Sequence, residues 1–377
     1  MEAVLILLLI YSLIYSTFIL VLIFGFRKVR YFESTMASPE TTFSIIVPFR
    51  DEVQNLPRLL QSLSQLDYPD EKWELIFVDD FSQDLSANLV NKWRLQNGKL
   101  QTTVLDNLRL TASPKKDAIT RAIPIIQNQW IITTDADCKV PANWLRTLNS
   151  FIVSNEVEMI AAPICYDGSS SFRHHFERLD MMSLQGATIG GFGIGKPFMC
   201  NGANFAYTKR LFAELRGFNG NDGIASGDDV FLLQKAAAAD VKKIGYLKSA
   251  DAIVSTQPSE NWLQLIHQRV RWAAKSTSYE SYFAADLALA VFLGNLVIVV
   301  AVFLAAFHIV KWEFVAGLFL LKCIPDFTLL IQANTFLRNG RFFFPLFSAL
   351  LYPFFCVLVG CFAMFGSYRW KGRKYTA

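Results

Sequence analysis

Hydrophobic residues gather at the two ends of this 377-residue chain, whereas apolar and polar segments alternate through its middle. Residues 3–26 carry no charge, and a helix of that length reaches across a hydrocarbon core of ~30 Å. Three further apolar stretches lie near the other end, at about 284–310, 314–336 and 342–366. We predict an N-terminal transmembrane helix over residues 1–27 and about three transmembrane or membrane-associated helices within residues 284–366.

The charges beside the first apolar run predict its orientation. Arg27, Lys28 and Arg30 follow the run directly, and basic residues favour the cytoplasmic side of a membrane. A cleavable signal peptide is disfavoured because the run is long, has no basic residue before it and has no small-residue cleavage site after it. We therefore predict a multi-pass protein of the cell (inner or cytoplasmic) membrane, with residue 30 onward in the cytoplasm.

The C-terminal crossings stay open at this point. The middle apolar stretch contains Lys322, Pro325 and Asp326, so it spans against its neighbours, re-enters or lies at the interface. Three crossings would leave the basic tail, residues 367–377, outside the cell, against the charge rule. Two crossings would place the tail inside.

Residues 43–283 have the composition of a soluble domain, and short apolar runs alternate there with segments of helical spacing. The predicted strands lie at 43–49, 73–80, 102–107 and 130–137, and the predicted helices at 55–66, 84–96 and 115–127. This alternation predicts an α/β fold in which a parallel sheet carries helices on both faces. We assign residues 43–258 to this domain.

Charged side chains stand at the ends of three predicted strands: Arg50 and Glu52 after the first, Asp79 and Asp80 at the second, Asp135 and Asp137 at the fourth. Parallel strands bring these ends to one edge of the sheet, where open α/β sheets bind ligands. Gathered carboxylates repel one another unless a cation is present, and Mg²⁺ or Mn²⁺ suits one or two carboxylates plus substrate phosphates. A lone D-x-D pair is most often a solvated turn, but the joint pattern predicts a site. Arg50 can also grip a phosphate in a bidentate contact.

A second carboxylate pair, Asp228 and Asp229, precedes a helical stretch. Capping of the helix explains only one of the two, so the other is left as a candidate site residue.

An amphipathic helix at the membrane surface is predicted over residues 259–283. Its polar and aromatic groups either snorkel toward headgroups or close over a diphosphate or an acceptor sugar. These groups are Gln268, Arg269, Arg271 and Trp272.

Charge and composition exclude several classes of protein. The net charge is only +4 and the basic residues flank apolar segments, which favours anionic lipid headgroups over nucleic acid as partners. Six cysteines without CxxC spacing and only four histidines indicate reduced thiols and disfavour a zinc enzyme. Residues 190–196, "GGFGIGK", fit a phosphate-loop pattern, but Pro197 replaces the metal-binding Ser/Thr and no strand precedes them. We interpret this segment as a loop near the acceptor.

Seven short motifs follow one another along roughly residues 43–280: "VPFRDE" (47–52), "VDDFSQD" (78–84), "KKDAI" (115–119), "TDADCKVP" (134–141), "NGANFAY" (201–207), "SGDDVFLL" (226–233) and "QRVRW" (268–272). Together they resemble the inverting glycosyltransferases of family 2, which have a GT-A fold, a Rossmann-like nucleotide-diphospho-sugar transferase domain. The apolar ends resemble the membrane-bound branch of that family, with its ceramide glucosyltransferase-like and polysaccharide synthase-like enzymes. The C-terminal "RWKGRKY" also recurs in that branch.

The resemblance implies site residues in the first half of the domain. The nucleotide and donor would be bound by Pro48, Arg50, Glu52, Asp79, Asp80, Lys115 and Asp135. Asp79 or Asp80 would hydrogen-bond the uracil or ribose, and Asp137 would coordinate a divalent metal, Mg²⁺ or Mn²⁺, on the diphosphate.

The resemblance also implies roles further along the chain. Asp229 takes the position of the general base. Asp228 stands where the family more often has Glu, so it keeps the charge with a shorter reach. The diphosphate and the acceptor would be held by Gln268, Arg269, Arg271 and Trp272.

The implied reaction moves a sugar from a nucleotide-diphosphate sugar, such as a UDP-sugar, to a hydroxyl of a lipid or lipid-linked acceptor, with inversion. One alternative is a processive polysaccharide synthase, which differs in the length of its product. Another is a metal-dependent nucleotidyltransferase, which releases pyrophosphate instead of a nucleoside diphosphate. The third is a non-catalytic membrane protein that retains the fold and binds no nucleotide-sugar.

Overall fold

The computed structural model describes residues 2–35, 37–168, 171–221, 223–224, 226–275, 281–337, 340, 345–370 and 373–376. The chain forms two compact units. We name them the sheet unit (Arg30–Asp167 and Met199–Gln257) and the membrane unit (Met1–Val29, Gly168–Phe198 and Pro258–Ala377). Residues 168–198 lie within the 43–258 range of the sequence analysis, and in the structure they belong to the membrane unit.

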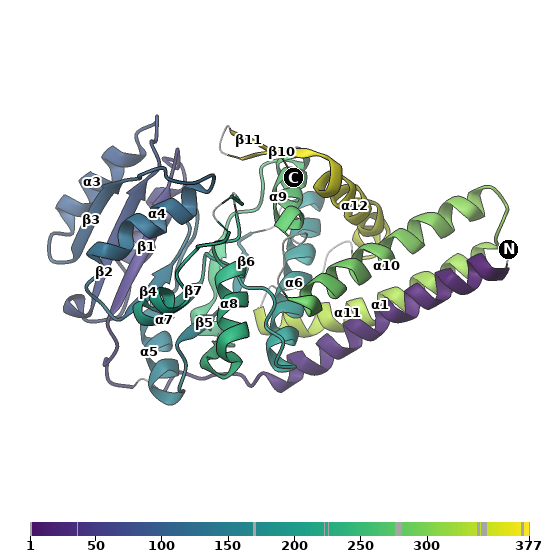
Figure 1. The fold of residues 1–377 in the computed structure, drawn as a ribbon, viewed down its shortest axis with the longest axis horizontal. Helices are drawn as coiled ribbons and strands as arrows, with labels where there is room; N and C mark the ends of the chain where they lie inside the picture. The colour runs from purple at the N-terminus through teal and green to yellow at the C-terminus, as the bar shows by residue number, and fades with distance from the viewer. Residues whose placement is uncertain are drawn as a thin grey trace. The chain divides into compact units, whose positions relative to one another are not determined.

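A seven-stranded mixed sheet forms the centre of the sheet unit (Figure 1), with the strand order β3-β2-β1-β4-β7-β5-β8. The strands are β1 Phe43–Phe49, β2 Trp73–Asp79, β3 Gln101–Asp106, β4 Trp130–Thr133, β5 Met159–Ala161, β7 Phe205–Thr208 and β8 Ile244–Tyr246. The first four are parallel, as predicted, whereas β7 runs antiparallel to both β4 and β5. A separate pair, β6 Ile164–Tyr166 and β9 Val254–Thr256, is parallel.

The apolar composition of strands β1 and β2 explains why they are buried. All seven residues of β2 and all but Pro48 in β1 are buried, as expected for parallel strands that are covered on both faces. The helices of this unit are α2 Leu56–Leu63, α3 Ser86–Gln96, α4 Pro114–Ala122, α5 Trp144–Ser154, α7 Lys209–Glu214 and α8 Val230–Asp240. Helix α4 ends just before Pro124, which lacks the N–H that a helix needs and lies in a 3-10 turn instead.

Lys248, in the segment after β8, makes the stability of the sheet unit depend on pH. Its side chain is 8% exposed, and burial lowers its pKa to about 8, whereas an unfolded chain has a lysine pKa of ~10.4. Between these values the unfolded state binds more protons, so stability rises as the pH increases. We expect the melting temperature to rise from pH 8 to 10, and Lys248→Met to lose part of that rise. An identical pH profile for the two proteins in thermal unfolding would contradict this assignment.

The membrane unit contains the four long apolar helices. They are α1 Glu2–Lys28, α10 Tyr282–Ala306, α11 Trp312–Leu337 and α12 Pro345–Phe365, and each is long and apolar enough to cross a membrane. Two further helices, α6 Phe172–Gly193 and α9 Trp262–Ala274, and a hairpin of β10 Ser367–Trp370 and β11 Arg373–Thr376 complete the unit.

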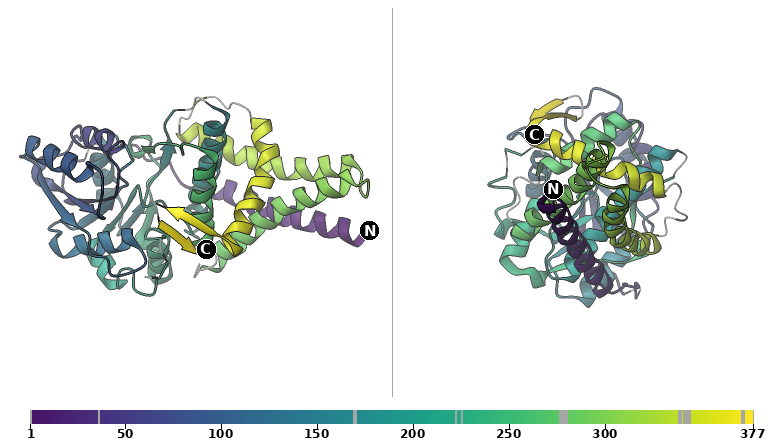
Figure 2. Two further views of the ribbon diagram at one scale, coloured as in Figure 1. Left: turned by 90° about the horizontal axis from the view of Figure 1, so that it is seen from above. Right: turned by 90° about the vertical axis from the view of Figure 1, so that its right-hand side faces the viewer.

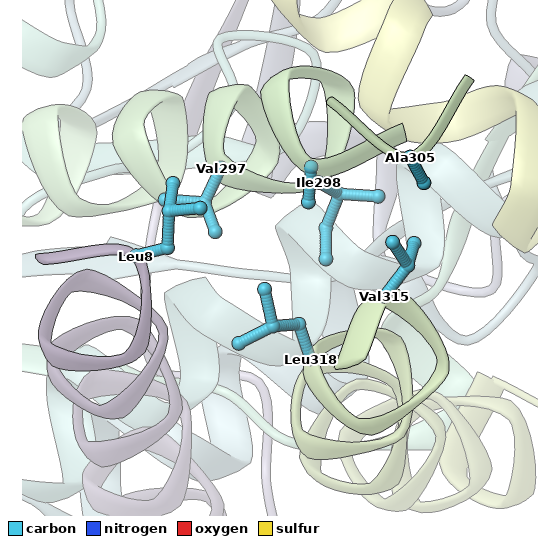
Figure 3. Close-up of a cluster of buried hydrophobic side chains, with 7 residues drawn as sticks. Leu8, Val297, Ile298, Ala305, Val315 and Leu318 are labelled. Atoms are coloured by element: carbon cyan, nitrogen blue, oxygen red, sulfur yellow. The ribbon is translucent and has the colours of Figure 1, made fainter. Parts of the chain in front are cut away.

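A buried apolar cluster joins α1, α10 and α11 near the N-terminus (Figure 3). It consists of Leu8, Val297, Ile298, Ala301, Ala305, Val315 and Leu318. Further along, the Tyr15 hydroxyl donates to Asp326 Oδ1 at 2.6 Å. Helices α1 and α11 are therefore parallel, because contacts move to higher residue numbers in both. Helix α10 is antiparallel to them, since Phe283 packs near Phe18 and Val297 near Leu8.

Glycines allow α1 and α6 to cross in backbone contact. A Cβ placed on Gly193 would lie 1.8 Å from the carbonyl oxygen of Gly25, and one on Gly190 would lie 2.4 Å from that of Leu22. Small residues at such crossings let two helices approach closely. The "GGFGIGK" segment that we interpreted as a loop therefore supplies the last turn of α6 and a helix-packing surface.

Gly193→Ala should destabilise the membrane unit by separating α1 from α6, with a loss of a few kcal/mol, as for other overpacked sites (roughly 1–3 kcal/mol). Gly317→Ala in α11 is the matched control, because its Cβ would meet nothing within 4 Å and alanine favours a helix. Thermal unfolding of the detergent-solubilised protein measures both. Equal melting temperatures for the two variants would contradict the crossing.

Candidate active site

Lys115 lies at the centre of a charged cluster in the sheet unit. It occupies the first turn of α4, and its Nζ lies 2.6 Å from Asp135 Oδ1 and 3.3 Å from Asp228 Oδ2. The side chains of Lys115, Asp135 and Asp228 are 17%, 40% and 10% exposed. Burial lowers the pKa of Lys115, but attraction by Asp135, Asp228 and Asp229 outweighs burial and raises the pKa above its ordinary value. The Lys115 ammonium thus stays charged. It holds together the carboxylate of Asp135, which follows strand β4, and the carboxylate of Asp228, which precedes helix α8.

Asp229 is held by two backbone amides. It is the N-cap of α8, where Oδ1 accepts from the N–H of Val230 at 2.7 Å, and Oδ2 accepts from the N–H of Gly202 at 2.8 Å. Capping therefore explains Asp229, and Asp228 is the second carboxylate, which pairs with Lys115. Each carboxylate oxygen has two lone pairs, so Asp229 keeps acceptor capacity for a further proton donor.

Gly202 is packed directly against this cluster. A Cβ added to it would lie 2.9 Å from both Asp228 Oδ2 and Lys115 Nζ. A larger residue at this position would force the end of the Lys115 or the Asp228 side chain to shift. Gly202 belongs to the "NGANFAY" motif, and the available sequence signal for it was a glycine directly after Asn201.

A second charged cluster surrounds Asp80 at the ends of β1 and β2. Asp80 is 5% exposed, and its Oδ1 accepts from Asn107 Nδ2 at 2.7 Å. Arg50 donates to the Asp80 carbonyl oxygen at 2.7 Å, and Arg109 Nη1 lies 3.8 Å from Asp80 Oδ1. Asn107 also donates to the Pro114 carbonyl oxygen, which connects this cluster to the start of α4.

The neighbouring predicted residues have local partners. Asp79 accepts from the N–H and hydroxyl of Ser82, at 2.9 and 2.5 Å, and so builds the turn after β2. Glu52 is buried and accepts from Asn55 Nδ2 at 2.6 Å. Pro48, in β1, is partly exposed.

Two residues beside Lys115 hold the loops of the site, and sequence reasoning did not assign them a role. Buried Asp117 accepts from the backbone N–H groups of Leu110 and Thr111, both at 3.1 Å, which fixes the loop that carries Arg109. Lys116 is 1% exposed and donates to the carbonyl oxygen of Asn221 at 2.6 Å. Both residues belong to the "KKDAI" motif. The sequence signal available for them was the presence of charged residues in a helix turn that is mostly buried.

The predicted residues of α9 belong to the membrane unit. Arg269 is 5% exposed, and its Nε donates to Asp180 of α6. The Arg269 guanidinium also lies 4.2 Å from the centroid of the Trp272 ring, a cation–π distance. Asp180 additionally accepts from the hydroxyl of Tyr352 in α12 at 3.2 Å. Arg269 therefore does not snorkel toward solvent, and Asp180, which the sequence analysis did not single out, is its partner.

Comparison with known proteins gives a family match for part of the chain, which includes most of the sheet unit and helix α6. Residues 44–216 match the family model described as "Glycosyl transferase family 2". Residues 44–216 form a family 2 glycosyltransferase domain. The resemblance to family 2 is thus confirmed over the residues that contain the first five of the seven motifs.

Named relatives are distant. Beta-monoglucosyldiacylglycerol synthase of Trichormus variabilis is 26% identical over 120 residues, which cover 32% of this chain and 25% of that protein. Glycosyltransferase AglE of Haloferax volcanii is 21% identical over 239 residues, which cover 63% of this chain and 73% of that protein. The chain therefore aligns with only about a quarter of the length of the first of these relatives.

A solved structure shares the fold. Mannosyltransferase PcManGT from Pyrobaculum calidifontis, in complex with GDP-Man and Mn²⁺, superimposes with a TM-score of 0.58 at 16% sequence identity. The superposition covers 96% of this chain and 98% of PcManGT. The predicted GT-A fold with one N-terminal and three C-terminal apolar helices is confirmed.

The carboxylates after β4 fit a divalent cation in the family 2 domain. Asp135 and Asp137 are both partly exposed, one residue apart, and Asp137 Oδ1 lies 3.6 Å from Cys138 Sγ. Among the residues that the structure describes, no group of three His, Cys, Asp or Glu side chains could hold a metal by itself. Mg²⁺ and Mn²⁺ suit such a sparse set, because substrate phosphates and water complete their octahedral shell.

Proposed function

We propose that this protein transfers a sugar from a nucleotide-diphosphate sugar to a hydroxyl of a lipid or lipid-linked acceptor, with inversion. The observation that carries the proposal is the Lys115 cluster. It joins the D-x-D segment, which lies within the family 2 match, to the Asp228–Asp229 pair. The relatives support the substrate classes, since one is named for a glucosyl-diacylglycerol product and PcManGT was solved with GDP-Man.

The donor would lie at the ends of the parallel strands. The nucleotide would contact Pro48, Arg50, Glu52, Asp79, Asp80 and Lys115, and the donor sugar side would contact Asp135. A divalent cation held by Asp137 would neutralise negative charge that develops on the leaving diphosphate. Mg²⁺ and Mn²⁺ both suit this carboxylate, and PcManGT was solved with Mn²⁺.

Asp229 would act as the general base. Its carboxylate takes the proton from the acceptor hydroxyl while that oxygen attacks the anomeric carbon. The new C–O bond forms as the bond from the anomeric carbon to the diphosphate breaks, and a nucleoside diphosphate leaves. A single displacement inverts the configuration. The two backbone N–H groups on Asp229 support this role, because they hold the base in one orientation.

Residues of α9 would hold the diphosphate and the acceptor. Arg269 and Arg271 offer guanidinium groups to phosphate, Gln268 offers an amide, and Trp272 offers a ring face to a sugar. The pairing of Arg269 with Asp180 supports a fixed position for Arg269. We also propose that the catalytic domain faces the cytoplasm of a cell membrane, since Arg27 and Lys28 end α1.

The purified protein should release a nucleoside diphosphate from a panel of UDP- and GDP-sugars when lipid acceptors are supplied. Chelation of divalent cations should abolish turnover, and Mg²⁺ or Mn²⁺ should restore it. Full activity in metal-free buffer would remove the role of Asp137. Release of pyrophosphate would instead identify a nucleotidyltransferase. On a sizing gel, a product one sugar longer than the acceptor is expected, whereas a ladder of long products would identify a processive polysaccharide synthase.

A further inference from the structure

Helix α12 contacts its neighbours in a way that a crossing helix does not. The α10–α11 turn lies beside the N-terminus at one end of the bundle, which we name the far end (Figure 1). Tyr352 of α12 meets Lys322 of α11, whose Nζ lies 5.6 Å from the Tyr352 ring centroid. Gly360 meets α10, since a Cβ on it would lie 2.6 Å from the ring of Phe292.

The depths of these two contacts can be compared. Lys322 lies ten residues after the start of α11, and Phe292 fourteen residues before the end of α10. At ~1.5 Å per residue they are roughly 15 and 21 Å from the far end. If α12 crossed the membrane toward the far end, Gly360, which follows Tyr352 by eight residues, would lie about 12 Å nearer to the far end than Tyr352 does. It lies about 6 Å farther away instead. Figure 2 shows α12 passing across α10 and α11 at a steep angle.

The segment after α12 returns to α9. Tyr368 of β10 is 4% exposed and shares one buried cluster with Leu265 and Val270 of α9. Phe355 of α12 belongs to the same cluster, and its ring centroid lies 5.0 Å from that of Phe176 in α6. Because α9 directly precedes α10, the second half of α12 and strand β10 lie at the end of the bundle opposite to the α10–α11 turn.

We infer that α12 does not cross the membrane but lies along the leaflet on the side where α1 ends. The chain then crosses three times, through α1, α10 and α11, and strands β10 and β11 lie on the same side as residue 30. This agrees with the charge rule, since the tail contains Arg369, Lys371, Arg373 and Lys374.

The lipid-facing surface of α12 follows from its exposure. Five of its exposed apolar side chains recur every four residues: Leu346, Leu350, Phe354, Leu358 and Phe362. Four more, at 347, 351, 364 and 365, widen this surface. We assign the acyl chains of that single leaflet as their partner, because apolar helices in this position bury one face in the headgroup–acyl boundary. The ammonium of Lys322 lies against the Tyr352 ring of α12 and is paired with Asp326 at 2.6 Å, and this pairing lowers the cost of burying both charges.

Protease protection of tags tests the topology in the full-length protein. A protease-cleavable tag is added after Ala377, before residue 1 or between His308 and Ile309. In right-side-out vesicles the tags at residue 1 and at 308 should be cleaved and the C-terminal tag protected. In inverted vesicles the pattern should reverse. A C-terminal tag that behaves like the tag at 308 would overturn the inference, because α12 would then cross.

Depth measurements test the lipid surface independently. Spin labels at Leu346, Phe354 and Phe362, in a chain whose native cysteines are replaced, should report one similar shallow depth in liposomes. Labels at Leu320 and Ile331 of α11 are the matched control, since both are exposed and their depths should differ by about 16 Å. A label at Phe354 that is deeper than both others would show a crossing helix. Labels shielded from lipid-soluble and water-soluble relaxing agents alike would show a protein partner instead. Either result overturns the inference.

Discussion

Asp229→Asn is expected to lower the rate of sugar transfer by roughly 10²–10⁴-fold, because the substitution removes the base that accepts the acceptor proton. Asparagine keeps one side-chain oxygen, so it can still accept from the Val230 N–H and cap α8. The bond from the Gly202 N–H loses its acceptor, because the asparagine Nδ2 that replaces Oδ2 is a donor. The fall should therefore appear in kcat, while binding of the donor nucleotide, measured by calorimetry, stays within a few-fold of wild type.

Asp240→Asn is the matched control for capping. Asp240 caps the 3-10 turn Val241–Lys243, where its Oδ1 accepts from the Lys242 N–H at 3.0 Å, and it is exposed. This variant should transfer sugar at the wild-type rate with a slightly lower melting temperature. If Asp229→Asn and Asp240→Asn have equal rates, Asp229 is a cap alone and the base lies elsewhere.

Lys115→Met should have the second large effect, on both stability and rate. It leaves Asp135 and Asp228 without the cation between them, and repulsion from the nearby Asp229 is added. We expect a loss of roughly 1–3 kcal/mol in the free energy of unfolding, since Asp135 is partly solvated. Misplaced carboxylates should lower the transfer rate by at least about 100-fold.

The double variant Lys115→Met/Asp228→Asn separates charge from packing. Replacing Asp228, one of the two carboxylates left without a cation, should recover part of the lost stability. The deviation of the two stability changes from additivity measures the coupling of Lys115 with Asp228. Denaturant unfolding of the four proteins in the cycle gives this value. Strict additivity would mean that the contact contributes nothing.

The pH dependence of Lys115 has a definite sign. Because its pKa is raised in the folded state, its stabilising effect is fully present below the unfolded lysine pKa of ~10.4 and is lost only above it. Wild type and Lys115→Met should therefore differ in stability by the same amount from about pH 6 to pH 9. A difference that shrinks in this window would contradict the raised pKa.

Local patterns in the sequence determined the elements that carry the site. Uninterrupted apolar runs fix helices such as α1 and α10, and short buried runs fix β1 to β4, because side-chain periodicity is a property of neighbouring residues. The rule that parallel strands share one end placed Asp80 and Asp135 at one edge of the sheet. The end of β4 at Thr133, before both Asp135 and Asp137, was less sharply defined by the pattern.

Tertiary structure alone decided which charges meet. Lys115 pairs with Asp228 across more than a hundred residues, Gly202 leaves them the space, and Arg269 pairs with Asp180 of another helix. Such pairings depend on how helices and loops pack, which no local periodicity encodes. For the same reason α12 has the composition of a membrane-crossing helix, while its contacts with α10, α11 and α9 place it across the bundle. Hydrophobicity determined that α12 meets lipid, and packing determined its direction.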